Sequence, residues 1–173
     1  MPTDLGYLAD LDLQSSVAVD INQFEHVVGH SHSDYNNTNS GLYRAFIWDD
    51  KNGMQGLGTL DSMENSIARG INKWDQVVGL SSDVPWEDTA AAFLWEDGEM
   101  LDLNDFLPTG SGWDLFEAND INDHGQIIGR GYFNGDVHGY LLSPTHANPI
   151  PSTFLLFGSG LVGLVTLRRK FSK

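Results

Sequence analysis

The residues best suited to chemistry in this chain are two histidines and an aspartate at alternate positions, His30-x-His32-x-Asp34. A strand places alternate side chains on one face, where imidazole and carboxylate groups can share a metal ion. These residues run into a polar stretch, 31–40, and fifty residues further along the same positions hold Leu80, Ser82 and Val84. The pattern favours an ordinary exposed loop over a metal site.

A second cluster, Asp120-x-Asn122-x-His124-Gly125, has the spacing that opens a calcium-binding loop. The twelfth position of such a loop carries a bidentate acid, and here it is Gly131. The chain has no cysteine, no Gly-x-Ser-x-Gly motif, no phosphate loop and no zinc-binding helix motif. We therefore predict no catalytic residues, no metal and no cofactor, and a protein that is not an enzyme.

The aromatic residues fall into two groups. Phe46 with Trp48, and Phe93 with Trp95, recur at equivalent positions 47 residues apart, which predicts packing inside the fold rather than a sugar-binding platform. Three other tryptophans stand near predicted turns and are the candidates for contact with a ligand: Trp74, Trp86 and Trp113.

The elements that must position these residues are repeats. Ala18, Ile21-Asn22 and Gly29 return in the same register 50 and 100 residues later. Between these copies, the phrase Ala45-Phe46-Ile47-Trp48 returns at residues 92–95 and, weakened, at 139–142. A third phrase, residues 54–60, returns at 100–107, and a partial copy of it opens the chain at residues 4–8. The chain is thus a repeat protein with an offset start.

Each repeat is expected to form short antiparallel strands. An apolar strand ends at an asparagine, a four-residue turn follows, and Val-Val-Gly or Ile-Ile-Gly forms the return strand. The asparagine side chains can cap the turns, and the last turn position suits a left-handed residue, which is Gly125 in one copy. A third, half-buried strand and a fourth strand beginning at Met54 or Met100 complete a unit of about 45 to 50 residues, the size of a β-propeller blade.

Composition narrows the classes of partner. The formal net charge is −15, and the body before Pro149 holds all 24 acidic residues but only five of the nine basic ones. Such a field repels phosphate backbones, which argues against nucleic-acid binding.

The repeated phrases resemble the bacterial extracellular repeats called the HAF family over about residues 3–144. The resemblance implies an all-β, β-propeller-like domain over 1–146, with units at about 14–60, 64–107 and 114–144 and an orphan strand at 3–8. It implies a surface-exposed or secreted protein and supplies no catalytic residues. We expect three four-stranded units, in which residues 3–8 could pair beside 138–143 and close the ring. Three blades are fewer than the usual minimum, so an open arc, a homodimeric six-bladed ring and a fragment of a longer array all stay open, an arc or fragment being favoured.

Residues 147–173 form a separate tail. A Pro-x-Pro-Ser element precedes an apolar stretch, residues 150–167, long enough to enter a membrane as a short helix, and a basic cluster follows. This segment resembles the PEP-CTERM sorting signal of Gram-negative bacteria, with Ile150 where that signal usually has Glu. The resemblance implies membrane insertion and processing by an exosortase-type enzyme, and its signal residues are Pro149, Pro151, Ser152, Arg168, Arg169 and Lys170.

The beginning of the sequence shows no basic and apolar leader, so we expect a truncated gene product or a misplaced start. The leading hypothesis is a non-enzymatic protein of the Gram-negative cell envelope or exterior that mediates surface or matrix interactions with a polysaccharide or protein. The alternative is a fragment of a carbohydrate-active or carbohydrate-binding propeller, that is, a hydrolase or a lectin.

Overall fold

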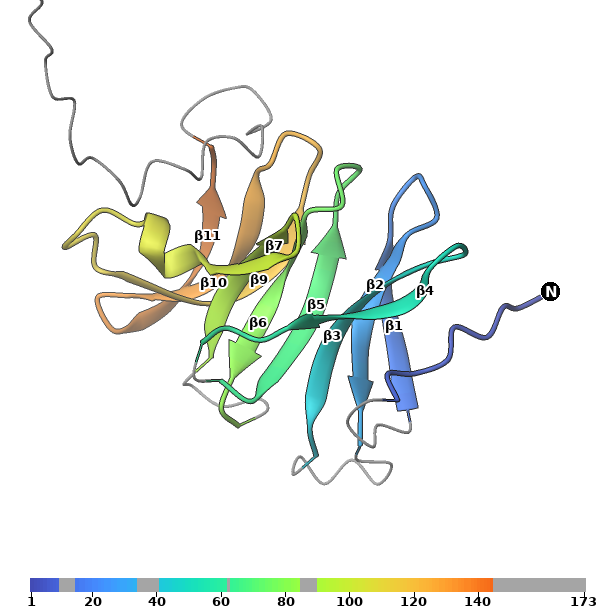
Figure 1. Cartoon of the computed structure of the whole chain (residues 1–173). Coiled ribbons are helices and arrows are strands. Elements are labelled where there is room, and N and C mark those ends of the chain that lie inside the picture. The colour runs from blue at the N-terminus through green and yellow to red at the C-terminus, as the bar shows by residue number, and fades with distance from the viewer. Residues whose placement is uncertain (10–14, 34–40, 62, 85–89, 145–173) are drawn as a thin grey trace, which may run out of the picture.

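The fold consists of three antiparallel β-sheets that follow one another along the chain (Figure 1). The computed structural model describes residues 1–9, 15–33, 41–61, 63–84 and 90–144. Sheet 1 contains β1 (Ser15–Ile21), β2 (Val27–His32), β3 (Tyr43–Asp49) and β4 (Gly53–Gly58). Sheet 2 contains β5 (Asn65–Ile71), β6 (Val77–Ser82), β7 (Ala91–Glu96) and β8 (Glu99–Asp102). Sheet 3 contains β9 (Trp113–Ile121), β10 (Ile127–Phe133) and β11 (Asp136–Leu142). The all-β repeat prediction is confirmed.

Two predicted details differ from the structure. The third sheet has three described strands rather than four. The phrase at residues 100–107 is only partly a strand, because β8 ends at Asp102 and a 3₁₀-helix, η1 (Leu103–Phe106), follows. The Asp102 side chain accepts a hydrogen bond from the Asn104 backbone N–H and so starts this helical turn.

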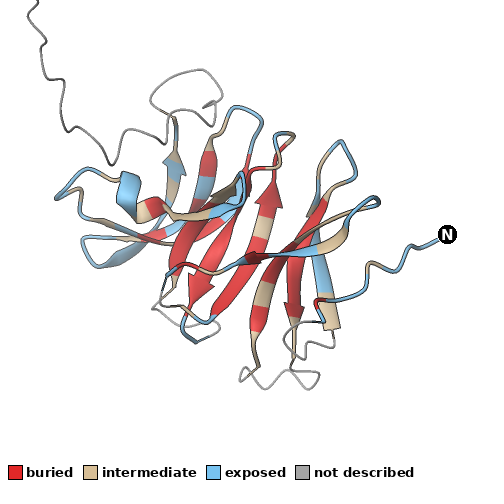
Figure 2. Ribbon diagram, viewed as in Figure 1, coloured by how far each residue is buried: buried red, intermediate tan, exposed pale blue. Residues whose placement is uncertain are grey.

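The core lies between neighbouring sheets. One cluster joins sheets 1 and 2 and includes Val28, Ala45, Ile71 and Phe93. A second joins sheets 2 and 3 and includes Val78, Leu94, Ile121 and Ile127. The two aliphatic residues at the start of β2, β6 and β10 therefore face opposite ways: Val28 and Val78 face the following sheet, and Val77 and Ile127 face the preceding one. Sheet 2 is covered on both faces, and burial concentrates in the middle of the stack (Figure 2).

The glycine that closes each Val-Val-Gly or Ile-Ile-Gly phrase has a steric cause. A Cβ atom on Gly29, Gly79 or Gly129 would overlap a backbone carbonyl oxygen of the neighbouring strand. In all three sheets the register of that strand pair shifts beside this glycine. The shift is a β-bulge, which brings the two backbones closer than a side chain permits.

The first residues of the chain lie against sheet 1 rather than beside β11. Leu8 is buried with Val27 and Phe46. The Leu8 N–H donates to Ser31 Oγ at 3.1 Å, and Ser16 Oγ donates to the Gly6 carbonyl at 2.6 Å. The prediction that residues 3–8 pair beside 138–143 within one chain is therefore wrong.

The position of this N-terminal segment, residues 3–8, reproduces a contact between sheets 1 and 2. After β4 the chain crosses to sheet 2, where the Leu60 N–H donates to Ser81 Oγ at 3.2 Å and Ser66 Oγ donates to the Gly58 carbonyl at 2.6 Å. The N-terminal segment thus occupies on sheet 1 the place that the end of unit 1 occupies on sheet 2.

Candidate functional site

The candidate site is built from the turns that join the first two strands of each unit. In the first turn, Asn22 Oδ1 accepts the backbone N–H groups of Phe24 and His26 at 3.0 and 3.1 Å. Asn72 and Asn122 make the same pair of contacts two and four residues ahead. The predicted asparagine caps are confirmed, and these three turns form one edge of the stack.

The last residue of each turn adopts the left-handed conformation. Glu25, Asp75 and Gly125 have φ angles of 64°, 61° and 73°. Glycine has no steric cost in this conformation, and the two acidic residues sustain it because the surrounding hydrogen bonds fix the turn. The three turns therefore keep the same shape although their sequences differ.

A ladder of asparagine side chains links the turns. Asn22 Nδ2 donates to the Asn72 carbonyl at 3.0 Å, and Asn72 Nδ2 donates to the Asn122 carbonyl at 3.2 Å. All three asparagines thus close their own turns through Oδ1, and Asn22 and Asn72 also reach the next sheet through Nδ2. The constant spacing of 50 residues is what brings these amides into line.

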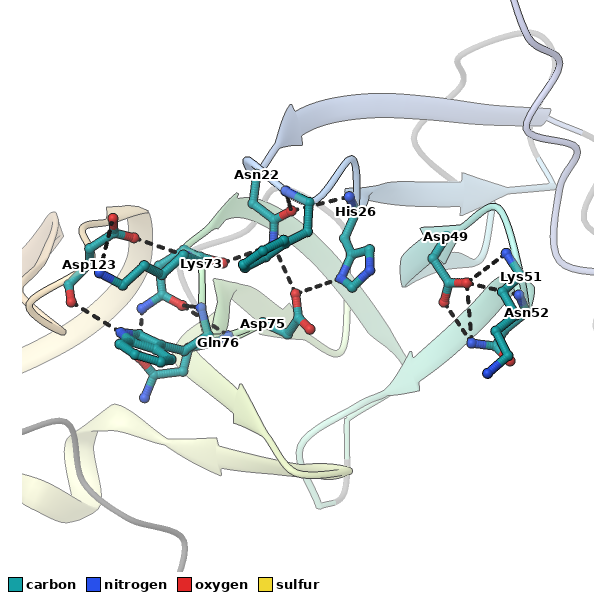
Figure 3. A network of polar contacts seen from close by, with 12 residues as sticks. Asn22, His26, Asp49, Lys51, Asn52, Lys73, Asp75, Gln76 and Asp123 are labelled. Carbon is teal, nitrogen blue, oxygen red and sulfur yellow. Dashed lines mark hydrogen bonds and ion pairs between the residues drawn. The ribbon is translucent and has the colours of Figure 1, made fainter.

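Charged side chains strengthen the same edge (Figure 3). Asp75 Oδ1 accepts from Asn22 Nδ2 at 2.8 Å and lies 2.7 Å from His26 Nδ1. One unit further, Asp123 Oδ1 accepts the Lys73 backbone N–H at 3.0 Å, and Lys73 Nζ lies 3.7 Å from Asp123 Oδ2. Carboxylates therefore bridge sheet 1 to sheet 2 and sheet 2 to sheet 3.

A groove of about 420 Å³ opens between the turns. All three units contribute to it: Asn22 and Gln23; Ile71, Asn72 and Lys73; and Ile121, Asn122, Asp123 and His124. Its walls combine apolar side chains with amide, carboxylate, ammonium and imidazole groups. Such a lining offers hydrogen bonds to a polar ligand together with some apolar contact.

Exposed aromatic rings stand on the turns that form this groove. Phe24 and Trp74 occupy equivalent turn positions and are 58% and 52% exposed. Trp74 Nε1 donates to the Asp123 carbonyl at 3.2 Å, and Lys73 Nζ lies 4.8 Å from the centre of the Trp74 ring. The indole is thus held in one orientation while more than half of its surface stays open.

The other two predicted ligand-contact residues do not join this site. Trp113 lies at the start of β9, partly buried, with its ring centre 4.9 Å from that of Phe133. Trp86 lies outside the described residues, as do the sorting-signal residues Pro149, Pro151, Ser152, Arg168, Arg169 and Lys170. None of the segments that the structure describes forms a helix with the length and hydrophobicity of a membrane span.

The histidine pair lies elsewhere, on β2 of sheet 1. His30 and His32 share one face with ring centres 5.9 Å apart, and both stand against Tyr43. His30 is buried, so the expectation of an exposed loop is wrong at this residue. Burial, assisted by the neighbouring His32 and Arg69, lowers the pKa of His30 to about 4. Asp34 is outside the described residues, and within them no group of three His, Asp or Glu side chains could hold a metal ion.

The calcium-loop residues have structural partners. Asp120 Oδ1 accepts the Ile121 backbone N–H at 2.8 Å, and Asn122 Oδ1 caps its turn. Two further carboxyl groups are perturbed near this edge. Burial raises the pKa of Glu96, against a hydrogen bond from Gln76, whereas hydrogen bonds from Asn52 lower the pKa of Asp49.

Sequence reasoning missed the groove and the ladder. The signal was present in the equal spacing of Asn22, Asn72 and Asn122, which were interpreted only as caps of their own turns. Equal spacing in stacked repeats also places equivalent side chains next to one another, so the same three residues predict a line of amides across the sheets.

Fold and groove together define an all-β repeat protein with stacked antiparallel sheets. A family model described as "Protein of unknown function (DUF3466)" matches residues 8–140, and the chain belongs to this family. The comparisons with curated proteins and with solved structures give no match.

Proposed function

We propose that this chain is a non-enzymatic binding protein of the bacterial exterior that holds a polysaccharide of the cell surface or matrix in the groove between its turns. The observation that carries the proposal is the groove itself. It is lined by equivalent residues of three successive units and flanked by the exposed ring of Trp74.

A polymer of repeated sugars suits a lining that repeats. Amide and carboxylate groups of Asn22, Asn122 and Asp123 can exchange hydrogen bonds with hydroxyl groups, and an aromatic ring can cover the apolar face of a sugar. The high negative charge of the body favours a neutral or cationic polysaccharide over a strongly anionic one.

The scaffold is proposed to be an arc of a β-propeller. Three antiparallel meanders follow one another, and each packs against the next through repeat-equivalent residues. The resemblance of the repeated phrases to HAF repeats supports an exported location. The resemblance of residues 147–173 to a PEP-CTERM signal supports insertion of residues 150–167 into the inner membrane and handling by an exosortase-type enzyme.

A carbohydrate-cleaving role is the alternative, and the groove supports binding better. Glycoside hydrolysis commonly uses two carboxyl groups on either side of the scissile bond. Among the described residues that line the groove, Asp123 is the one carboxylate, and the Lys73 backbone and side chain already contact it.

Affinity electrophoresis of the full chain in mild detergent, through gels containing defined neutral or cationic polysaccharides, tests this function. We expect one or more polymers to retard the protein, and we expect Trp74→Ala to weaken that retardation at least about tenfold, since losing a contact of about 1.4 kcal/mol has this effect. Phe106→Ala is the matched control, because Phe106 is exposed on η1 outside the groove. Equal retardation of Trp74→Ala and wild type, or release of reducing ends from the polymer, would contradict the proposal.

A further inference from the structure

Sheets 1 and 3, at the two ends of the stack, expose surfaces that are complementary to one another. Sheets 1 and 2 meet through the same repeat positions as sheets 2 and 3. In each contact, the forward face of one sheet, which points toward the following unit, packs against the backward face of the next sheet, which points toward the preceding unit. Among the described residues, no sheet therefore covers the forward face of sheet 3, and no sheet covers the backward face of sheet 1, against which the N-terminal segment alone packs.

The forward face of sheet 3 exposes aliphatic side chains, together with Arg130, which lies two residues after Ile128 on the same face of β10. Ile128 and Leu141 are 48% and 63% exposed, whereas their equivalents in sheet 2, Val78 and Leu94, are fully buried and 9% exposed. Val137 lies on the same face of β11 as Leu141 and is 56% exposed. The sequence thus keeps bulky aliphatic residues at positions that the other sheets cover with a neighbour.

The backward face of sheet 1 also exposes apolar side chains and is complementary to the forward face of sheet 3. Ile21 is 58% exposed, although its equivalents Ile71 and Ile121 are at most 5% exposed. Ala18 is also exposed, while Ala68 and Ala118 are fully buried. In both internal contacts, the isoleucine of this face belongs to the same cluster as the forward-facing valine, Val28 or Val78. A neighbouring sheet would accordingly set Ile128 against Ile21.

The N-terminal segment supplies what sheet 3 lacks. In unit 1, the end of β4 pairs with β3, with Gly58 opposite Ala45, and then crosses to sheet 2. In sheet 3 the described strands end with β11, whose outer edge has no partner strand among them. Gly6 and Leu8 already stand on sheet 1 as Gly58 and Leu60 stand on sheet 2. On a sheet 1 that packed against sheet 3, this segment would lie beside β11 and pair with its free edge.

The asparagine ladder also has two open ends. Asn72 Nδ2 donates to both Gln76 Oε1 and the Asn122 carbonyl, whereas within the described part of the chain Asn122 Nδ2 donates to Gln126 Oε1 alone. At the other end, the Asn22 carbonyl accepts the Glu25 N–H but has no donor from a preceding sheet among the described residues. The donor at one end matches the acceptor at the other.

We propose that a second copy of this chain binds head to tail, so that sheet 3 of each copy packs against sheet 1 of the other and two copies close into a ring of six sheets. Both junctions are then equivalent, no forward or backward face stays open, and the N-terminal segment of each copy extends sheet 3 of its partner. Six sheets fall within the usual range of about four to eight for closed rings of this kind.

The test combines mass in solution with directed cross-linking of the full chain in mild detergent. Because the chain has no cysteine, Ile21→Cys and Ile128→Cys each introduce one thiol. We expect light scattering to give two chains of 19.1 kDa each. We expect a short bismaleimide to yield covalent dimers when the two differently tagged variants are coexpressed, and none when either is present alone.

Other outcomes overturn the proposal. A monomer at all concentrations tested, a dimer without the 21-to-128 product, self-linking of Ile128→Cys alone, or particles of three or more chains would each contradict the two-copy ring. In the same assay, Leu141→Asp should weaken dimerisation at least about tenfold, because it places a charge in the apolar junction. Phe106→Asp, an exposed position on η1, should leave it unchanged. A Leu141→Asp chain that dimerises as tightly as wild type would also refute the junction.

Discussion

Strands β6 and β10 occupy equivalent positions in successive units, but their residues differ in burial. Every residue of β6 is buried, whereas buried and exposed residues alternate along the first five residues of β10. The two strands share a Val-Val-Gly or Ile-Ile-Gly start and the same bulged neighbour. What differs is that β6 has a sheet on each side, while β10 has one. Position in the stack therefore decides how much each residue contributes to stability, and matched substitutions in the two sheets measure that contribution.

The largest difference is expected between two glycines that are not equivalent in the repeat, one beside the bulge of sheet 2 and one on β11 of sheet 3. Gly79→Ala forces a methyl group into the Ile67 carbonyl and to within 2.9 Å of the Phe93 ring, and it should lower the free energy of unfolding by at least about 3 kcal/mol. Gly139→Ala, on β11, meets its nearest atom at 3.8 Å and should change stability by less than about 0.5 kcal/mol. Urea unfolding followed by tryptophan fluorescence measures both. Equal effects would show that the bulge in sheet 2 yields to a side chain.

The next difference concerns two leucines at equivalent positions. Leu94→Ala leaves a cavity between sheets 2 and 3 and should cost about 3 kcal/mol. Leu141→Ala should cost less than about 1 kcal/mol, because Leu141 is already largely exposed. Both are compared by urea unfolding at a protein concentration low enough to keep the chain monomeric. A cost at Leu141 that matches the cost at Leu94 would mean that something covers the forward face of sheet 3 within a single chain.

Another difference, between sheets 1 and 2, is expected in how strongly each makes stability depend on pH. Position 30 is histidine where sheet 2 has the buried Leu80, and burial keeps His30 neutral with a pKa of about 4. Because the unfolded chain takes up this proton near the ordinary pKa of about 6.5, stability is full above that pH and falls as the pH drops toward 4, by about 3 kcal/mol.

His30→Leu should remove that part of the pH dependence, as thermal unfolding between pH 7 and pH 4 would show. His124→Gln is the control, because His124 is exposed in its turn and should leave the profile as in wild type. An unchanged profile in His30→Leu would assign the acid sensitivity to other groups.

The smallest effect isolates one hydrogen bond of the ladder. Asn72→Ala and Asn122→Ala both remove a turn cap and a bond to the glutamine four residues on, and Asn72→Ala also removes the bond to the Asn122 carbonyl. The first should be more destabilising than the second by about 1 kcal/mol, the usual net value of such a bond. Chemical unfolding of both variants gives the difference between the two losses in free energy of unfolding. A difference near zero would mean that the ladder results from the stacking of the sheets and does not stabilise it.

The sequence predicted the local structure well because local structure depends on residues close in the chain. The hairpins, the asparagine caps and the left-handed turn residues follow from Asn22, Asp75, Gly125 and their neighbours alone. The buried positions of Phe46 and Phe93 followed from their recurrence on equivalent strands.

What failed depends on contacts between units. The place of residues 3–8 is fixed by Ser16 and Ser31, whose role appears only when they are aligned with Ser66 and Ser81 in space. The burial of His30 depends on the contact between sheets 1 and 2, where its neighbour Tyr43 packs with Ile67 and Leu80. The groove likewise forms from three turns that are 50 residues apart, and no single segment contains its shape.

The crossing segment after β4 also shows which portion of the chain can be deleted or duplicated without breaking a contact between sheets. Leu8 and Leu60 enter successive sheets through the same serine contact, so the portion from residue 9 to residue 60 begins and ends at structurally equivalent points. Excising that portion, or copying it in tandem, leaves every crossing in place. The sequence unit that duplicates therefore begins and ends at other residues than a sheet does. Each duplication would add one sheet together with the segment that crosses to the neighbouring sheet.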